Sequence, residues 1–96
     1  MTPEQEKQVF NRTVAFFGDE SQKIMAIEEM SELIKELTKE LRQRGDIEHI
    51  AEEIADVEIT LSQLKIIYDV HERVASMREY KLNRISKIMD DLAKKN

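Results

Sequence analysis

The stretch that decides the fold is residues 20–44, ESQKIMAIEEMSELIKELTKELRQR, in which apolar side chains recur every three or four positions. This spacing is typical of one face of an α-helix. The apolar residues of this face are Ile24, Ile27, Met30, Leu33, Ile34, Leu37 and Leu41. A second stretch, residues 47–68, reads IEHIAEEIADVEITLSQLKIIY and repeats the period. The sequence therefore predicts two long amphipathic helices in succession.

Capping signals define where the helices begin and end. Thr2-Pro3-Glu4-Gln5 is a capping box with proline at the first helical position. Gly18-Asp19 and Gly45-Asp46 each end one helix and offer an aspartate as the N-cap of the next. Asp69-Val70-His71-Glu72 offers a similar cap near residue 70. The predicted helices cover residues 3–17, 20–44, 47–68 and 70–94.

Length and composition set the fold class. With 2 Gly and 1 Pro among 96 residues, turn residues are too few for a many-stranded β fold, and the length allows a single domain, 1–96. Short connections favour antiparallel neighbours, so we expect an all-α, antiparallel helical bundle of about four helices. The apolar faces of residues 20–44 and 47–68 are wide for one small chain, which indicates a homo-oligomer.

The charge distribution and the missing residue types exclude several functions. Residues 1–68 carry 8 cationic and 15 acidic side chains, whereas residues 69–96 carry 7 and 5. A nucleic-acid-binding protein usually has a dominant basic surface, so we expect no nucleic-acid polymer as partner. No apolar run approaches the length of a membrane span. Without cysteines or an apolar leader, the expected location is the cytoplasm.

Two acids of the 47–68 stretch lie where a helical wheel places apolar side chains. Glu53 shares a stripe with Ile50 and Val57, and Asp56 lies at the edge of the same arc. An ionised carboxylate among apolar groups is costly unless a cation, hydrogen bonds or water compensate its charge. The position of Glu53 therefore indicates a functional site.

Glu29 and Glu32 form a second pair at the same spacing on the preceding helix, since residues three apart project from one side. Glu29 borders the apolar arc, whereas Glu32 lies further out. If the two helices are antiparallel neighbours, Glu29, Glu32, Glu53 and Asp56 can converge. Four oxygen ligands without His or Cys suit a hard divalent cation, above all Mg²⁺.

Other acids have simpler explanations. Glu36 and Glu40 lie on the polar side of the 20–44 helix, spaced to pair with Lys39 and Arg44, so we expect them on a solvated face. Glu58 falls among apolar residues, and we expect it to form a salt bridge across a subunit interface rather than to act in catalysis.

The last predicted helix has the opposite anomaly. Lys81 lies in the middle of its apolar arc, with Arg84 beside it. The apolar residues of the arc are Val74, Met77, Ile85, Ile88 and Leu92. A lone lysine in such a position usually extends past the core to water. A phosphate held between a metal ion and these two cations would, however, compensate both sets of charges.

These motifs resemble those of a known family. Glu28-Glu29-x-x-Glu32, followed after 20 residues by Glu53-Ile-Ala-Asp56, resembles the EExxE…ExxD signature of the MazG-like, all-α NTP pyrophosphatases. Lys81-Leu82-Asn83-Arg84 is similar to the Lys-(Phe/Leu)-x-Arg element of many members, and Gln22 lies where they often have a glutamine. The resemblance extends from about residue 20 to residue 86.

The resemblance implies a Mg²⁺-dependent nucleotide pyrophosphohydrolase, with Mn²⁺ as a possible substitute ion. Such an enzyme cleaves a nucleoside triphosphate between the α- and β-phosphates and releases the monophosphate and pyrophosphate. The residues that match the family's metal ligands are Glu29, Glu32, Glu53 and Asp56, and those that match its substrate-binding positions are Lys81, Arg84 and Gln22. Members of the family assemble as homodimers or homotetramers. The preferred nucleotide stays open, and the related phosphoribosyl-ATP pyrophosphohydrolases are a second possibility.

The sequence suggests two alternative functions. A ferritin-like di-iron site needs Glu-x-x-His on two helices, and neither His49 nor His71 provides that spacing. A non-catalytic helical bundle or coiled-coil interaction protein explains the composition equally well. That alternative does not explain why Glu53 and Lys81 both lie in apolar arcs.

Overall fold

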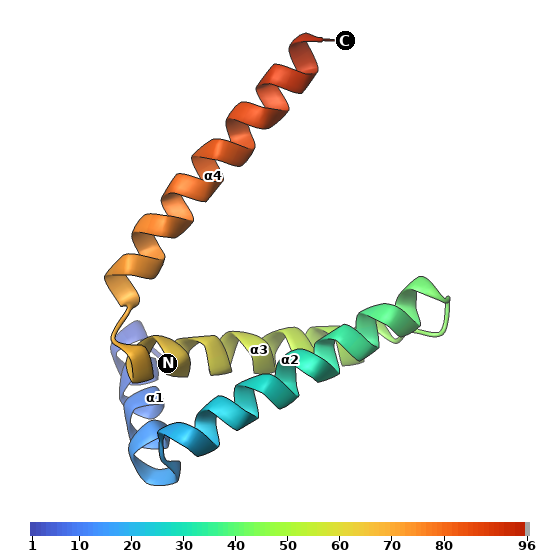
Figure 1. Cartoon of the computed structure of the whole chain (residues 1–96). Helices are drawn as coiled ribbons and strands as arrows, with labels where there is room; N and C mark the ends of the chain where they lie inside the picture. The colour runs from blue at the N-terminus through green and yellow to red at the C-terminus, as the bar shows by residue number, and fades with distance from the viewer. Residues whose placement is uncertain (96) are drawn as a thin grey trace.

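The computed structural model describes residues 1–95, which form four α-helices and no strand (Figure 1). The helices are α1 (Pro3–Phe17), α2 (Asp19–Leu41), α3 (Ile47–Tyr68) and α4 (His71–Lys94). The helices α2 and α3 run antiparallel, and α1 lies across the end of the pair where α2 begins and α3 ends. The predicted all-α class and the number of helices are confirmed.

Two of the four expected caps are present. The Thr2 hydroxyl accepts a hydrogen bond from the Gln5 amide, and the Thr2 amide donates to the Gln5 side chain at 2.8 Å, which completes the capping box. The Asp46 carboxylate caps α3 by accepting from the Glu48 amide at 2.9 Å. These bonds satisfy backbone groups that the first turn of a helix leaves unpaired.

The other two caps were predicted wrongly. Gly18 ends α1 and also begins α2, so Asp19 is already the first residue of that helix. Asp69 ends α3 in a left-handed conformation, with φ of 52°, and Val70 precedes α4 without a side-chain cap. The predicted second helix also continued too far, because the chain leaves α2 after Leu41 and turns.

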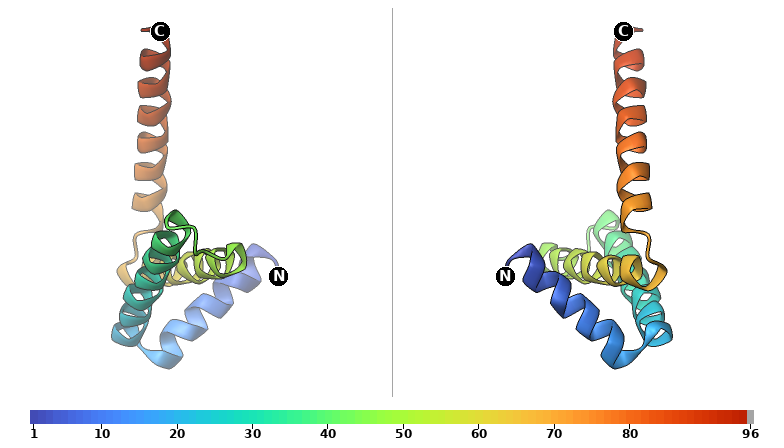
Figure 2. Two further views of the ribbon diagram at one scale, coloured as in Figure 1. Left: turned by 90° about the vertical axis from the view of Figure 1, so that its right-hand side faces the viewer. Right: turned by 90° about the vertical axis from the view of Figure 1, so that its left-hand side faces the viewer.

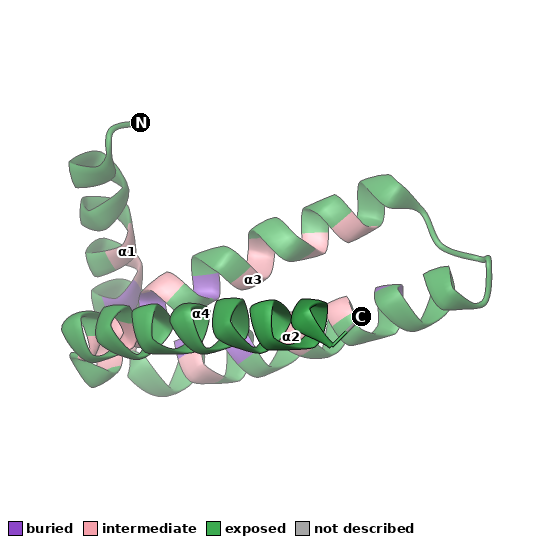
Figure 3. Ribbon diagram, turned by 90° about the horizontal axis from the view of Figure 1, so that it is seen from above, coloured by how far each residue is buried: buried purple, intermediate pink, exposed green. Residues whose placement is uncertain are grey.

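Little of the molecule is buried. Within residues 1–95, the buried residues include only two apolar side chains, Val14 and Ala26, and otherwise consist of Gln22, Glu36, Thr60 and Gln63. All of them lie on α1, α2 or α3, as Figure 3 shows. Most of the aromatic residues are exposed; these are Phe16, Phe17, Tyr68 and Tyr80.

Helix α4 extends away from the other three helices. It contacts α3 and no other described helix, and it has no buried residue (Figures 1 and 2). The backbone at Asp69 and Val70 directs α4 outward instead of back along α3. One chain therefore does not complete the expected four-helix bundle. None of the described helices combines the length and apolar content that a membrane span requires.

The connection between α2 and α3 is tightly packed at Gly45. A Cβ atom on this residue would lie 2.5 Å from the Cα of Glu40, closer than real side chains approach a backbone. Gln43, in the same connection, has a φ of 62°, which is costly for a residue with a side chain. The connection thus requires glycine at position 45 and would tolerate glycine at position 43.

We expect Gly45→Ala to lower the free energy of unfolding by about 1–3 kcal/mol, because the new methyl group overlaps the α2 backbone. Urea unfolding followed by circular dichroism would measure this loss. Gln43→Gly is the matched control, since it removes a left-handed side chain two residues away and should leave stability unchanged or slightly raised. Equal stability of Gly45→Ala and wild type would contradict the close approach.

Candidate metal centre

Three carboxylates from two helices meet between α2 and α3. Glu29 comes from α2, whereas Glu53 and Asp56 lie one turn apart on α3, and each offers an oxygen within 4.8 Å of the other two. All three side chains are half-buried. The antiparallel contact of α2 with α3 creates this cluster, because the middle of each helix lies against the other.

The electrostatics of the cluster are unfavourable as it stands. The Oε2 atom of Glu53 is buried and has no hydrogen-bond partner. Partial burial, together with hydrogen bonding to and repulsion from the carboxylates of Asp56 and Glu53, raises the pKa of Glu29 from 4.5 to about 7. Without a cation, the site therefore favours a proton on Glu29.

No basic side chain compensates the cluster in residues 1–95. The ion pairs in this part of the chain join Lys39 to Glu36 and His49 to Asp46, and neither pair includes a cluster residue. A divalent cation with oxygen ligands is one way to balance three converging carboxylates, and Mg²⁺ is typically held by few carboxylates together with water. The donor set therefore fits a hard metal ion.

The fourth predicted ligand lies apart from the others. Glu32 is exposed, one turn beyond Glu29 on α2, and it is not among the carboxylates that converge. The helical wheel had already placed Glu32 further from the apolar arc than Glu29. The expected convergence of four acids is thus found for three.

Gln22 lies on the face of α2 that packs against the rest of the body and is 5% exposed. It is seven residues, about 10 Å along the helix axis, from Glu29. Gln22 is a buried polar residue, as are Thr60 and Gln63 on α3. Its predicted substrate-binding role stays a prediction.

Lys81 and Arg84 do not lie beside the acids within one chain. Both are exposed and lie in the middle of α4, which contacts only the end of α3 and extends away from α2 (Figure 1). The expected antiparallel bundle requires α4 to fold back along α3, and the joint at Asp69 directs α4 outward instead. A phosphate bridge between these cations and the cluster would need a second chain.

Glu36 corrects another expectation. It was predicted on a solvated face, but it is 8% exposed and lies two turns from Glu29 on the same side of α2. Its predicted pairing partner is confirmed, since Lys39 Nζ lies 3.3 Å from a Glu36 oxygen. The burial of Glu36 could have been predicted from its position seven residues after Glu29, because residues seven apart lie on nearly the same face of a helix.

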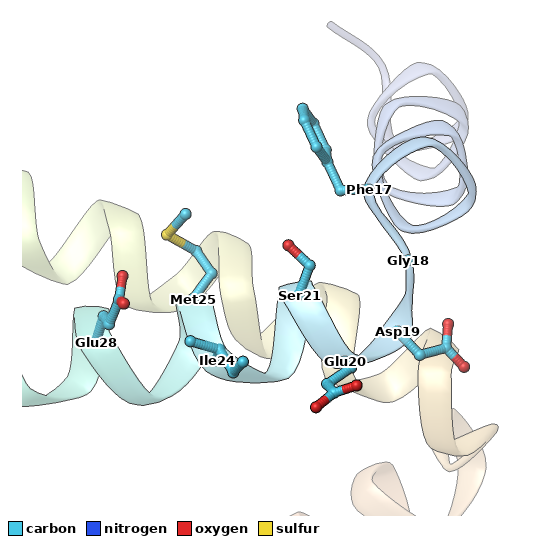
Figure 4. A pocket seen from close by; sticks show the side chains of 8 residues that line it. All are labelled: Phe17, Gly18, Asp19, Glu20, Ser21, Ile24, Met25 and Glu28. Carbon is cyan, nitrogen blue, oxygen red and sulfur yellow. The ribbon is translucent and has the colours of Figure 1, made fainter.

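A separate hollow lies at the corner between α1 and α2, with a volume of about 610 Å³. Figure 4 shows Phe17, Ser21 and Met25 pointing toward the same side of the corner, while Asp19 and Glu20 point away. The part of the hollow that α2 lines is exposed, and its residues include Ile24, Met25 and Glu28. None of the three cluster residues lines this hollow.

Comparison with known proteins gave no relative. No protein-family model matches the chain, no curated protein matches it, and no solved structure matches it. The resemblance to the MazG-like pyrophosphatases therefore depends on the quoted motifs alone.

We expect the metal-free protein to lose stability as the pH rises from about 5 to 7. Glu29 has a pKa of about 7 when folded and an ordinary value of 4.5, so in this interval the folded state holds a proton that the unfolded state has released. Glu29→Gln should flatten this part of the profile. Urea unfolding at a series of pH values, with a chelator present, would measure the slopes.

Glu40→Gln is the matched control for this experiment, because it removes an exposed acid from the same helix. It should keep the wild-type slope. If Glu29→Gln also loses stability between pH 5 and 7 as steeply as wild type, then Glu29 is not the group that causes this loss.

Proposed function

We propose that the protein is a Mg²⁺-dependent nucleoside triphosphate pyrophosphohydrolase that releases a nucleoside monophosphate and pyrophosphate. The observation that carries the proposal is the meeting of Glu29, Glu53 and Asp56 between α2 and α3. The buried, unpaired oxygen of Glu53 supports it, because a ligand at that oxygen would offset the cost of its burial. The motifs of these residues are those that resemble the MazG-like signature.

In this proposal Glu29, Glu53 and Asp56 hold the metal ion, with Mn²⁺ as a substitute. Glu32 joins them through a water molecule or after its exposed side chain turns toward the cluster. Bound Mg²⁺ would neutralise the triphosphate and lower the pKa of an attacking water. In this proposal the water attacks phosphorus directly, and one of the three carboxylates accepts its proton.

Lys81 and Arg84 are proposed to contact the substrate phosphates, where they would stabilise the negative charge that shifts during bond cleavage. Since α4 extends away from its own cluster, this role belongs to the α4 helix of a second copy in a homodimer or homotetramer. Nucleoside triphosphates are intracellular compounds, so the proposal keeps the cytoplasmic location expected from the sequence.

A non-catalytic interaction protein is the second candidate. The observation that favours it is the large apolar surface of α4, on which Met77, Ile85, Ile88 and Leu92 are each about half exposed. Such a protein has no need of a cation between α2 and α3. Metal binding therefore distinguishes the two functions.

We expect saturating Mg²⁺ or Mn²⁺ to raise the melting temperature, because a ligand that binds only the folded state stabilises it by about 2.7 kcal/mol at 100 times its dissociation constant. Glu53→Gln should lose most of this shift. Glu52→Gln, an exposed acid next to it on α3, is the control and should keep the shift. Scanning calorimetry at neutral pH, with Na⁺ at equal ionic strength, separates binding from screening.

We expect pyrophosphate, and not orthophosphate, when a panel of NTPs and dNTPs is incubated with the protein and Mg²⁺. Glu53→Gln should reduce pyrophosphate release by at least about 100-fold, because it removes a proposed metal ligand. Glu52→Gln should retain it. Orthophosphate as the product, or full turnover by Glu53→Gln, would contradict the assigned reaction or the assigned residue.

A further inference from the structure

A second hollow, which we call the junction hollow, lies where α1 crosses the end of α3, and the first residue of α4 also lines it. Its volume is about 440 Å³, within the range of pockets that hold small molecules. Side chains from three helices line it, and they include Glu6, Lys7, Phe10, Lys65, Ile66 and His71. None of the three carboxylates of the candidate metal centre is among its lining residues.

The lining of the junction hollow is basic, although the surrounding part of the chain is acidic. Residues 1–68 carry 8 cationic and 15 acidic side chains, yet Lys7 of α1 and Lys65 of α3 line the same hollow, together with His71. The ion pairs formed within residues 1–95 include neither lysine. Lys65 is half-buried, and a partly buried ammonium group without a counter-ion is costly. An anion in the junction hollow would offset this cost.

The junction hollow also has an apolar part. The ring of Phe10 and the side chain of Ile66 are half-buried and line it beside the lysines. Phe10 lies three positions after Lys7 on α1, so the helical period places an aromatic ring and an ammonium group on the same side of that helix. The arrangement therefore suits a molecule that has both an anionic and an apolar part.

The number of charges limits the ligand to one anionic group. Two lysines face one acid in the lining, Glu6, and His71 adds a positive charge only when it is protonated. This balance compensates a single carboxylate or phosphate group. It does not suit a polyanion such as a nucleoside triphosphate, so the junction hollow differs from the candidate metal centre in the ligand that it fits.

We propose that the junction hollow binds a small organic anion in which one carboxylate or phosphate group is attached to an aromatic or aliphatic group. Lys7, Lys65 and His71 hold the anionic group, while Phe10 and Ile66 contact the apolar part. Because α4 contacts no described helix other than α3, a ligand held by both Lys7 and His71 would connect α1 to the start of α4. The proposal involves neither the metal ion nor the nucleotide, so it can fail or hold independently of the proposed function.

The two histidines of the chain allow a direct test. His71 lines the junction hollow, whereas His49 lies near the start of α3 beside Asp46 and does not line it. The imidazole resonances of the metal-free full chain can be followed by NMR during a titration with phenyl phosphate, at constant pH and ionic strength. We expect the His71 resonances to shift and reach saturation, while those of His49 stay unchanged.

Two further probes separate the parts of the ligand. Inorganic phosphate lacks the apolar part and should bind at least about tenfold more weakly than phenyl phosphate. Benzoate carries a carboxylate on the same ring and should also bind. Whichever of benzoate and phenyl phosphate binds more tightly identifies the anionic group that the site prefers.

Lysine variants test the assigned residues. Lys65→Gln and Lys7→Gln should each weaken phenyl phosphate binding by about tenfold or more, because each removes a charged hydrogen-bond donor. Lys35→Gln is the matched control, since it removes an exposed lysine of α2 that does not line the junction hollow, and it should bind as wild type does. Circular dichroism would show that all three variants keep the helicity of wild type.

Three results would overturn the proposal. The first is the absence of a saturable His71 shift with both phenyl phosphate and benzoate. The second is an equal response of His49 and His71, or equal affinity for inorganic phosphate and phenyl phosphate, since either would indicate a general effect of anions on the protein. The third is a loss of affinity in Lys35→Gln as large as that in Lys65→Gln.

Discussion

The antiparallel contact between α2 and α3 is the interaction on which the rest of the structure depends. It joins two helices through a connection of five residues and brings the middle of each against the middle of the other. Apolar packing in this contact is modest, since several of its buried side chains are polar. The carboxylates of Glu29, Glu53 and Asp56 therefore share a half-buried space where their mutual repulsion is felt strongly.

The sequence predicted most of what depends on helical period and local capping. The four helices, the capping box at Thr2 and the cap at Asp46 all follow from interactions within a few residues. The apolar stripe around Glu53 similarly predicted its partial burial, because the direction of a side chain on a regular helix is fixed by its position. The convergence with Glu29 required one further assumption, that the two helices are antiparallel neighbours.

Two features were not predicted from the sequence, namely the direction of α4 and the burial of Glu36. The first depends on single backbone angles and the second on how a helix packs against its neighbours. The left-handed conformation of Asp69 decides where α4 points, and an aspartate at that position gives no clear signal of it. The placement of Lys81 and Arg84 relative to the acids depends on that angle. Glu36 was wrongly predicted to be exposed for a related reason. It lies on the polar side of the predicted helix, but the contact between α2 and the other helices extends as far as Glu36 and buries it.

The short connection at residues 42–46 has a consequence for how the chain can change in length. Inserting one residue within α2 between Glu29 and Leu41 would rotate Glu29 by about 100° relative to the end of the helix and shift it by 1.5 Å. The cluster would then separate, even though every residue of it was retained. Insertions and deletions that preserve the helical phase of both partners belong in the connection itself, provided that the residue beside Glu40 remains a glycine.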